Sequence, residues 1–330
     1  MDKKIKQIII LFLGLVVIGL GTTVYGQDIN DAKRAIKAGD QEKRADNYEK
    51  AIEAFDKCIQ ICNQLGDEEG TDELLSAAQK KVTKSHLDYG NELLQQDKFE
   101  EALKHYHKTL ELSNQYNLSD YKEKPQNNIP KVHYAQGKNQ LSAPNYQPSI
   151  ALFDNALAGD PDYGWAHIRK AFAYSRIDSA QQMEQTVKDA IQVGKNTEQE
   201  KVVSTAKEIA YKFFYNKGAK ALKAKNYATA IPNLEKAIQY NGNTTLYHYL
   251  AISYAKESQY EKAVENEKKV IEALKEEKSQ EDMAQYYYTL GTYYENLGQS
   301  GNACEAYSSA AFGKYKENAE YKIEHVLNCE

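Results

Sequence analysis

Residues 218–237 read GAKALKAKNYATAIPNLEKA, and the spacing of small and large residues in this stretch recurs along the chain. Gly218 is followed by Ala230 after twelve residues, by Leu234 after sixteen and by Ala237 after nineteen. The same steps begin at four other glycines, namely Gly39, Gly90, Gly137 and Gly291. Two further copies begin at an alanine, Ala171 and Ala251. The chain therefore contains an internal repeat.

The repeat is typical of two antiparallel helices that meet at a close contact. A glycine on the first helix and an alanine on the second let the backbones approach, and a large residue one turn later fills the space beside them. In the quoted stretch Asn226 and Tyr227 lie between the two halves, where a polar residue before an aromatic one indicates the turn. The pattern predicts an all-α fold built from helix-turn-helix units.

This pattern resembles the tetratricopeptide repeat, which places Gly or Ala, Tyr, Ala, an aromatic residue, Ala and Pro along 34 residues. Seven copies can be aligned, and they start near residues 32, 83, 130, 164, 211, 244 and 284. The resemblance implies an α-solenoid of about seven helix-turn-helix repeats. A C-terminal helix over residues 314–330 is expected to cap the exposed apolar end of the last repeat.

The predicted organisation has four parts. Residues 1–26 form a signal peptide, 27–129 hold the N-terminal repeats, 130–313 hold the central and C-terminal repeats, and 314–330 form the cap. The apolar spacing from Asp72 to Gln96 predicts one extended first helix. A polar loop is expected over residues 113–129, with Pro130 in the first turn of the next helix.

The N-terminal stretch has the composition of an export signal. Lys3, Lys4 and Lys6 precede a thirteen-residue apolar run at positions 8–20, which is shorter than a transmembrane helix needs. Val24-Tyr25-Gly26 suits cleavage before Gln27, although an uncleaved anchor is the alternative. We expect an exported protein that is periplasmic, otherwise associated with the cell envelope, or secreted. After cleavage no stable membrane insertion is expected.

The composition argues against nucleic acid as a partner. The 330 residues carry a formal net charge of -5 with a pI near 5.9, whereas a nucleic-acid-binding chain normally has a basic surface. Tyrosine accounts for 26 residues, against 8 Phe and 1 Trp, and its ring is apolar along the sides and hydrogen-bonding at the tip. Such residues suit the many small contacts of stacked repeats.

The sequence contains no pattern that predicts catalysis. There is no His-Glu-x-x-His pair, Walker loop, Gly-x-Ser-x-Gly elbow or Gly-x-Gly-x-x-Gly motif. The carboxylates alternate with lysines along helix faces, as over residues 272–281, which is typical of a solvated surface. We therefore expect a protein that is not an enzyme and that has no cofactor and no metal site.

The four cysteines form two pairs with different expectations. Cys304 follows the packing residue Ala303 and Cys329 lies at the end of the cap, so a disulfide between them would tie the cap to the last repeat; two unpaired thiols are the alternative. Cys58 and Cys62 lie four apart on one helix, where Cβ atoms are too far apart for a disulfide. We interpret them as core thiols.

The resemblance also implies a binding surface, because the first helices of such repeats line a concave groove. Counting groove positions in each copy gives Lys131, Tyr134, Trp165, Arg169, Phe172, Arg176, Lys212, Tyr215 and Asn216. This set is aromatic and basic, as in binding hot spots, and predicts a protein or peptide partner of acidic character. Packing of these aromatic residues between repeats is one alternative. Another is an envelope protein that binds carbohydrate or cell-wall fragments through the same rings.

Overall fold

The computed structural model describes residues 28–141 and 145–329, and the predicted signal peptide lies outside this range. The described residues form helices and no β-strand, in two compact units. One unit comprises the described residues up to 96 together with 104–123, and the other comprises 97–103 and the residues from 124 onward. The predicted all-α fold is confirmed.

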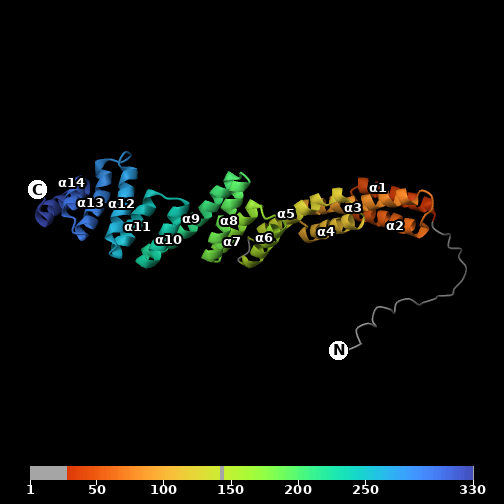
Figure 1. Cartoon of the computed structure of the whole chain (residues 1–330), viewed down its shortest axis with the longest axis horizontal. Helices are drawn as coiled ribbons and strands as arrows, with labels where there is room; N and C mark the ends of the chain where they lie inside the picture. Colours follow the sequence, from red (N-terminus) through yellow and green to blue (C-terminus); the bar gives the residue numbers. More distant parts are fainter. Residues whose placement is uncertain (1–27, 142–144, 330) are drawn as a thin grey trace, which may run out of the picture. The chain divides into compact units, whose positions relative to one another are not determined.

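Successive helices pack as antiparallel pairs along the chain (Figure 1). The bounds of the first six helices are α1 Ile29–Arg44, α2 Tyr48–Leu65, α3 Thr71–Gln95, α4 Phe99–Gln115, α5 Glu123–Gln140 and α6 Gln147–Gly159, with a short 3-10 helix at Ser119–Tyr121. The next eight are α7 Gly164–Arg176, α8 Ala180–Asn196, α9 Glu200–Lys223, α10 Tyr227–Tyr240, α11 Thr244–Lys256, α12 Tyr260–Leu274, α13 Gln280–Asn296 and α14 Ser300–Ala310. Within the described residues these are the seven predicted helix pairs.

The small-to-large contact that defines the repeat is present in the structure. A methyl group built on Gly137 would lie 2.7 Å from Cε1 of Phe153, and one built on Gly291 would lie 2.8 Å from Cδ1 of Tyr307. Phe153 and Tyr307 are both fully buried. Because only a residue without a Cβ leaves room for these rings, the glycines set how closely paired helices approach.

The turns inside the pairs share one closure. Lys225 and Ser258 adopt the left-handed conformation with φ of 57° and 58°. After Lys225, the Asn226 N–H donates to the Ala221 carbonyl at 2.9 Å, and after Ser258 the Gln259 N–H donates to the Tyr254 carbonyl at 2.8 Å. These bonds satisfy carbonyls at the end of the first helix and reverse the chain within a few residues. Asn226 and Gln259, the polar residues that precede Tyr227 and Tyr260, therefore lie in the turns, as the sequence pattern predicts.

Helix bounds confirm one expectation and correct another. The extended helix predicted from Asp72 to Gln96 is α3, which has 25 residues. The polar loop predicted over residues 113–129 is wrong, because α4 continues to Gln115 and α5 begins at Glu123. Pro130 is an interior residue of α5, buried against the end of α6, where a methyl group on Gly159 would lie 2.8 Å from its Cγ. The proline serves packing rather than helix initiation.

The C-terminal segment caps the last repeat as predicted. A 3-10 turn at Gly313–Tyr315 leads into α15, Lys316–Tyr321, and then into a π-helical stretch, Lys322–Leu327, both of which pack on α14. Ala319 is fully buried there and belongs to the same apolar core as Tyr307. The cap therefore covers an end that would otherwise expose the core of the final pair.

Candidate peptide-binding surface

Four of the predicted site residues form one stripe along α7. Trp165, Arg169, Phe172 and Arg176 follow at steps of four, three and four residues, which places them on one face of a helix. The stripe begins one residue after the helix does and ends at its last residue. Helix α7 contacts α9, the first helix of the next repeat. The stripe thus lies on the row of first helices, as the repeat frame predicts.

Arg169 has an unusual environment within this stripe. Its Nε atom is buried and has no hydrogen-bond partner, although the side chain as a whole is only half-buried. A buried donor without an acceptor costs free energy, on the order of 1–3 kcal/mol. Within the described residues, Arg169 is therefore a guanidinium of the stripe whose Nε is not engaged by another side chain.

Arg176 is held by one contact with the preceding repeat and one within its own helix. Its Nε donates to the hydroxyl of Tyr146 at 3.3 Å, and its guanidinium lies over the ring of Phe172, 5.8 Å from the centroid. Tyr146 is the residue that precedes α6. These contacts fix the direction of the guanidinium while leaving the residue exposed.

On α9 the predicted residues divide between packing and exposure. The ring of Tyr215 stacks on Tyr211, with centroids 5.7 Å apart and planes 17° from parallel, and it also packs against the apolar core. Lys212 is exposed and forms an ion pair with Glu208 one turn earlier. Asn216 is exposed beside them. The charge of Lys212 is thus partly offset within its own helix.

The remaining predicted aromatic residues also contribute to packing. Tyr134 on α5 lies between two rings, 4.8 Å from Tyr163 and 6.0 Å from Phe153, while Lys131 nearby is exposed. Burial, together with the charges of its neighbours, raises the pKa of Tyr163 to about 12. Trp165 is half-buried and packs against the core of its unit. Of these residues the cations Lys131, Arg176 and Lys212 are exposed, whereas the rings of Tyr134, Trp165 and Tyr215 are partly covered by packing.

A second polar group lies on the first helices at His248, which the repeat frame counts as a groove position, although its pairing with a buried acid was not predicted. His248 on α11 places Nδ1 at 2.9 and 3.1 Å from the two carboxylate oxygens of Glu267 on α12. Glu267 is fully buried, whereas the His248 side chain keeps 26% of its surface exposed. Burial raises the pKa of Glu267 above its ordinary value, and His248 opposes this effect. The only sequence signal was a glutamate sixteen residues after Ala251, where other copies have a large apolar residue.

A pair of histidines in contact with each other lies in the other unit. His86 on α3 and His105 on α4 place their Nδ1 atoms 2.8 Å apart, so one ring donates and the other accepts. Burial, followed by the nearby His105 and Lys108, lowers the pKa of His86 to about 4. The pair joins two helices of one repeat in an uncharged state.

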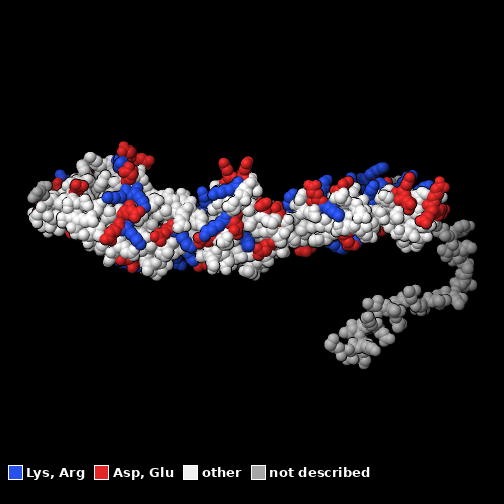
Figure 2. All heavy atoms as spheres, in the orientation of Figure 1, with Lys and Arg blue, Asp and Glu red and all other residues white. Residues whose placement is uncertain are grey.

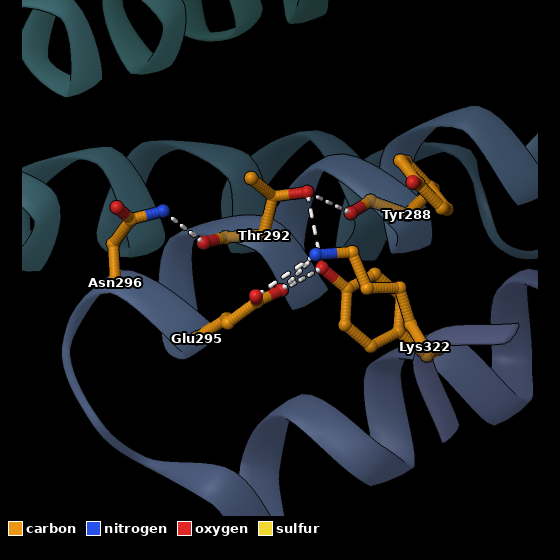
Figure 3. A network of polar contacts seen from close by, with 6 residues as sticks. Tyr288, Thr292, Glu295, Asn296 and Lys322 are labelled. Carbon is orange, nitrogen blue, oxygen red and sulfur yellow. Dashed lines mark hydrogen bonds and ion pairs between the residues drawn. The ribbon is translucent and has the colours of Figure 1, made fainter. Parts of the chain in front are cut away.

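The end of the chain holds a further polar network (Figure 3). Glu295 on α13 accepts from Lys322 of the π-helical stretch at 2.8 and 2.9 Å, and from the hydroxyl of Tyr307 at 2.7 Å. Cys304 and Cys329 form a disulfide, with their Cα atoms 5.9 Å apart. Both links join the cap to the last helix pair, so this network has a structural explanation.

Charge on the surface is mixed rather than concentrated. Lysine and arginine side chains alternate with acidic ones over the face in view (Figure 2). Residues 28–141 and 145–329 contain no group of three or more His, Cys, Asp or Glu side chains placed to hold a metal ion. Within the same residues, no helix has both the length and the apolar character to span a bilayer.

Comparison with known proteins agrees with the repeat pattern. The model of the tetratricopeptide repeat family matches residues 42–65 and 284–311, which overlap the helix pairs α1–α2 and α13–α14. No curated protein sequence matches the chain.

Three similar solved structures give low TM-scores. A MamA fragment from Desulfovibrio magneticus RS-1 is 18% identical, covers 58% of this chain and 96% of its own, and gives a TM-score of 0.28. The P58(IPK) TPR domain is 11% identical. The match covers 89% of this chain and 98% of that domain, and it gives a TM-score of 0.30. The yeast Sti1 TPR2AB domain in its pHSP90 complex is 15% identical, with coverage of 75% and 96% and a TM-score of 0.29.

At such scores these likenesses add nothing to the argument. The assignment depends instead on the chain's own residues and on the family model. Residues 42–65 and 284–311 match that model directly, and the other helix pairs repeat the same spacing and the same paired packing. These two segments are therefore repeats of the tetratricopeptide type, within a chain of similar helix pairs.

Proposed function

We propose that this protein is an interaction module that binds an acidic peptide segment of a partner protein on the row of first helices centred on α7. Stacked helical repeats present extended concave surfaces, and such surfaces are used for binding. The observation that carries the proposal is the stripe on α7, in which Arg169 and Arg176 alternate with Trp165 and Phe172 along one helix face. A carboxylate is the acceptor that pairs best with a guanidinium.

Charge supports this choice of ligand. The chain as a whole is acidic, with a formal net charge of -5, yet the predicted site residues include the cations Lys131, Arg169, Arg176 and Lys212 and no acid. Hydrogen bonds between a guanidinium and a carboxylate are shorter and stronger than neutral ones. The partner segment would therefore be selected by acidic side chains or by a terminal carboxylate.

The setting we propose is outside the cytoplasm, in the cell envelope or beyond it. This part depends on the sequence of residues 1–26, in which a basic start, a short apolar run and small residues precede Gln27. The module would present a preformed surface to its partner, without covalent chemistry. A carbohydrate site is less well supported, because one face of the Tyr215 ring is covered by Tyr211 and Tyr134 lies between two other rings.

An array of short peptides tests the proposal directly. Residues 27–330 would be applied to acidic peptides and to versions with Gln and Asn in place of Glu and Asp. We expect retention of the acidic peptides and a weaker interaction for Arg169→Gln. Loss of a charge-assisted hydrogen bond is worth about 1.5–3 kcal/mol, which corresponds to roughly 10- to 100-fold in Kd.

Arg34 on α1 supplies the matched control. It is exposed and forms an ion pair with Asp31 on its own helix, so Arg34→Gln removes the same charge from a position outside the proposed surface. Arg34→Gln should bind like the wild type. Equal affinity of Arg169→Gln and the wild type, or equal binding of acidic and amide peptides, would show that the proposal is wrong.

A further inference from the structure

The His248–Glu267 pair uses one nitrogen of a partly exposed imidazole and leaves the other on the far side of the ring. Nδ1 faces Glu267, so Nε2 on the other side of the ring is directed away from the carboxylate. His248 occupies the fifth position of its repeat, which the frame assigns to the groove. Its partial exposure contrasts with the full burial of Glu267. The histidine therefore links a buried acid to the binding surface.

The buried carboxylate determines which atom of His248 carries hydrogen. A fully buried carboxylate with net negative charge is strongly disfavoured, so the pair retains one additional proton. If that proton is on the histidine, the imidazolium has hydrogen on both nitrogens. If it is on Glu267, Nδ1 accepts from the acid and the hydrogen of the neutral ring is on Nε2. Both arrangements place a donor at Nε2.

His248 is the basic group that opposes the effect of burial, which raises the pKa of Glu267. On α13, Tyr286 meets the imidazole edge-on with ring centroids 5.3 Å apart. Burial, and then the nearby Glu267, raise the pKa of Tyr293 on the same helix. On α10, the neighbouring acid Glu235 accepts from Tyr254 rather than from His248. The elements packed around the pair thus contribute phenols and an acid that is already bonded.

We propose that His248, positioned by Glu267, donates a hydrogen bond from Nε2 to a carboxylate oxygen of the acidic peptide and forms a second anion-binding point of the groove. This inference rests on the function proposed above. It adds a recognition element on α11 to the one on α7, and it makes binding pH-dependent. As pH rises and the pair loses its extra proton, the donor is lost and affinity for the acidic peptide falls.

The protonation of His248 can be measured without any ligand. Selective ¹⁵N labelling of histidine in residues 27–330, with His248→Gln to assign the signals, reports which ring nitrogen carries hydrogen. At pH 7 we expect Nε2 of His248 to be protonated. A bare Nε2 in the wild type at pH 7 would refute the proposal, whatever the protein binds.

Binding is tested with the double variant His248→Gln/Glu267→Val, which keeps the helix pair intact. Removing His248 alone would leave a buried acid unpaired, so Glu267→Val is added, which reproduces the combination of Ala171 and Val187 in the fourth copy. The probe is a peptide of alternating Glu and Ser, and affinity is measured from about pH 5.5 to about pH 8.5. The wild type should weaken on the order of tenfold across this range. The double variant should bind more weakly at low pH and show no such dependence.

Two controls separate this inference from the function on which it depends. His107→Gln, an exposed histidine on α4 in the other unit, should leave the pH dependence unchanged. Arg169→Gln should weaken binding at every pH and keep the slope. If the double variant retains the pH dependence of the wild-type affinity, the role of His248 is wrong. If the wild type binds no acidic peptide, the proposed function is wrong, even where the nitrogen spectra show the expected donor.

Discussion

Replacement of Gly218 by alanine tests whether the close helix contact sets the geometry of the repeat. A methyl group at this position of α9 would lie 2.7 Å from Cδ2 and 2.8 Å from Cγ of Leu234 on α10, and 3.3 Å from the Leu234 backbone nitrogen. Leu234 is fully buried, so its side chain has no free space into which to move. The backbone contact means that the helix itself must also shift.

Two opposing effects determine the size of the change. Alanine in place of glycine inside a helix normally stabilises it by about 0.5–1 kcal/mol. Overpacking a well-filled core costs about 1–3 kcal/mol, and contacts below 3 Å to a buried branch point belong at the upper end. We expect Gly218→Ala to lower the free energy of unfolding by about 1–2 kcal/mol, which is roughly a 5- to 30-fold change in the unfolding equilibrium.

Gly301 is the matched control, because it is also a helical glycine but nothing lies within 4 Å of a methyl group built there. Gly301→Ala should be neutral or stabilising by up to about 1 kcal/mol. Urea unfolding followed by circular dichroism gives both free energies, and hydrogen exchange of α9 and α10 localises the effect. Equal effects of the two substitutions would refute the reasoning.

A second substitution tests the contact itself. The fourth copy combines Ala171 with Val187, both fully buried, so alanine is tolerated where the facing residue is smaller. Leu234→Val alone should cost about 1 kcal/mol because it removes one buried methylene group. In the double variant the clash is relieved, and the loss should be smaller than the sum of the two single losses by at least about 1 kcal/mol. Simple additivity would mean that Gly218 and Leu234 do not limit each other.

Two further predictions concern the cap. The Cys304–Cys329 disulfide closes a loop across a sequence separation of 25, and its reduction should destabilise the cap by up to ~3 kcal/mol. Hydrogen exchange in α15 should then become faster, and unchanged exchange would contradict this prediction. Burial tends to raise the pKa of Glu295, but hydrogen bonds from Lys322 and Tyr307 outweigh it and hold the pKa below its ordinary value. The stabilisation is therefore complete above the unfolded pKa of about 4.3 and is lost as pH falls further. The hydrogen-exchange protection factors of the cap should fall at acid pH in the wild type and stay constant in Glu295→Gln.

The helix pairs could be predicted because their determining contacts lie at a fixed separation in sequence. A glycine and the large residue sixteen positions later meet in the structure at Gly137, Gly218 and Gly291. The start of α5 could not be predicted in this way. Its Pro130 is accommodated inside the helix because it packs against Gly159 of the neighbouring helix, and that contact depends on tertiary structure.

The candidate surface was less predictable, because a groove position does not determine which side of a ring is covered. Tyr134, Trp165 and Tyr215 occupy predicted positions, yet each also packs against rings or the core of its unit. Cations differ in this respect, because their charged ends remain near solvent while their stems pack. For a repeat of this kind the sequence frame is therefore a better guide to the positions of Arg and Lys than to the exposure of Tyr.

Tyrosine at the large-residue site shows how one repeat position acquires a polar partner. The Tyr106 hydroxyl donates to Asn91 at 2.8 Å, and the Tyr307 hydroxyl lies 3.3 Å from the Thr292 hydroxyl. In both copies the partner directly follows the repeat glycine, whereas Phe occupies the large site in two copies with Asp or Lys after the glycine. Glu267 extends this logic, because a carboxylate at the same site reaches across the pair to a histidine on the first helix. A polar contact that completes the core in two repeats thus becomes, in the sixth, a connection from the core to a partly exposed histidine.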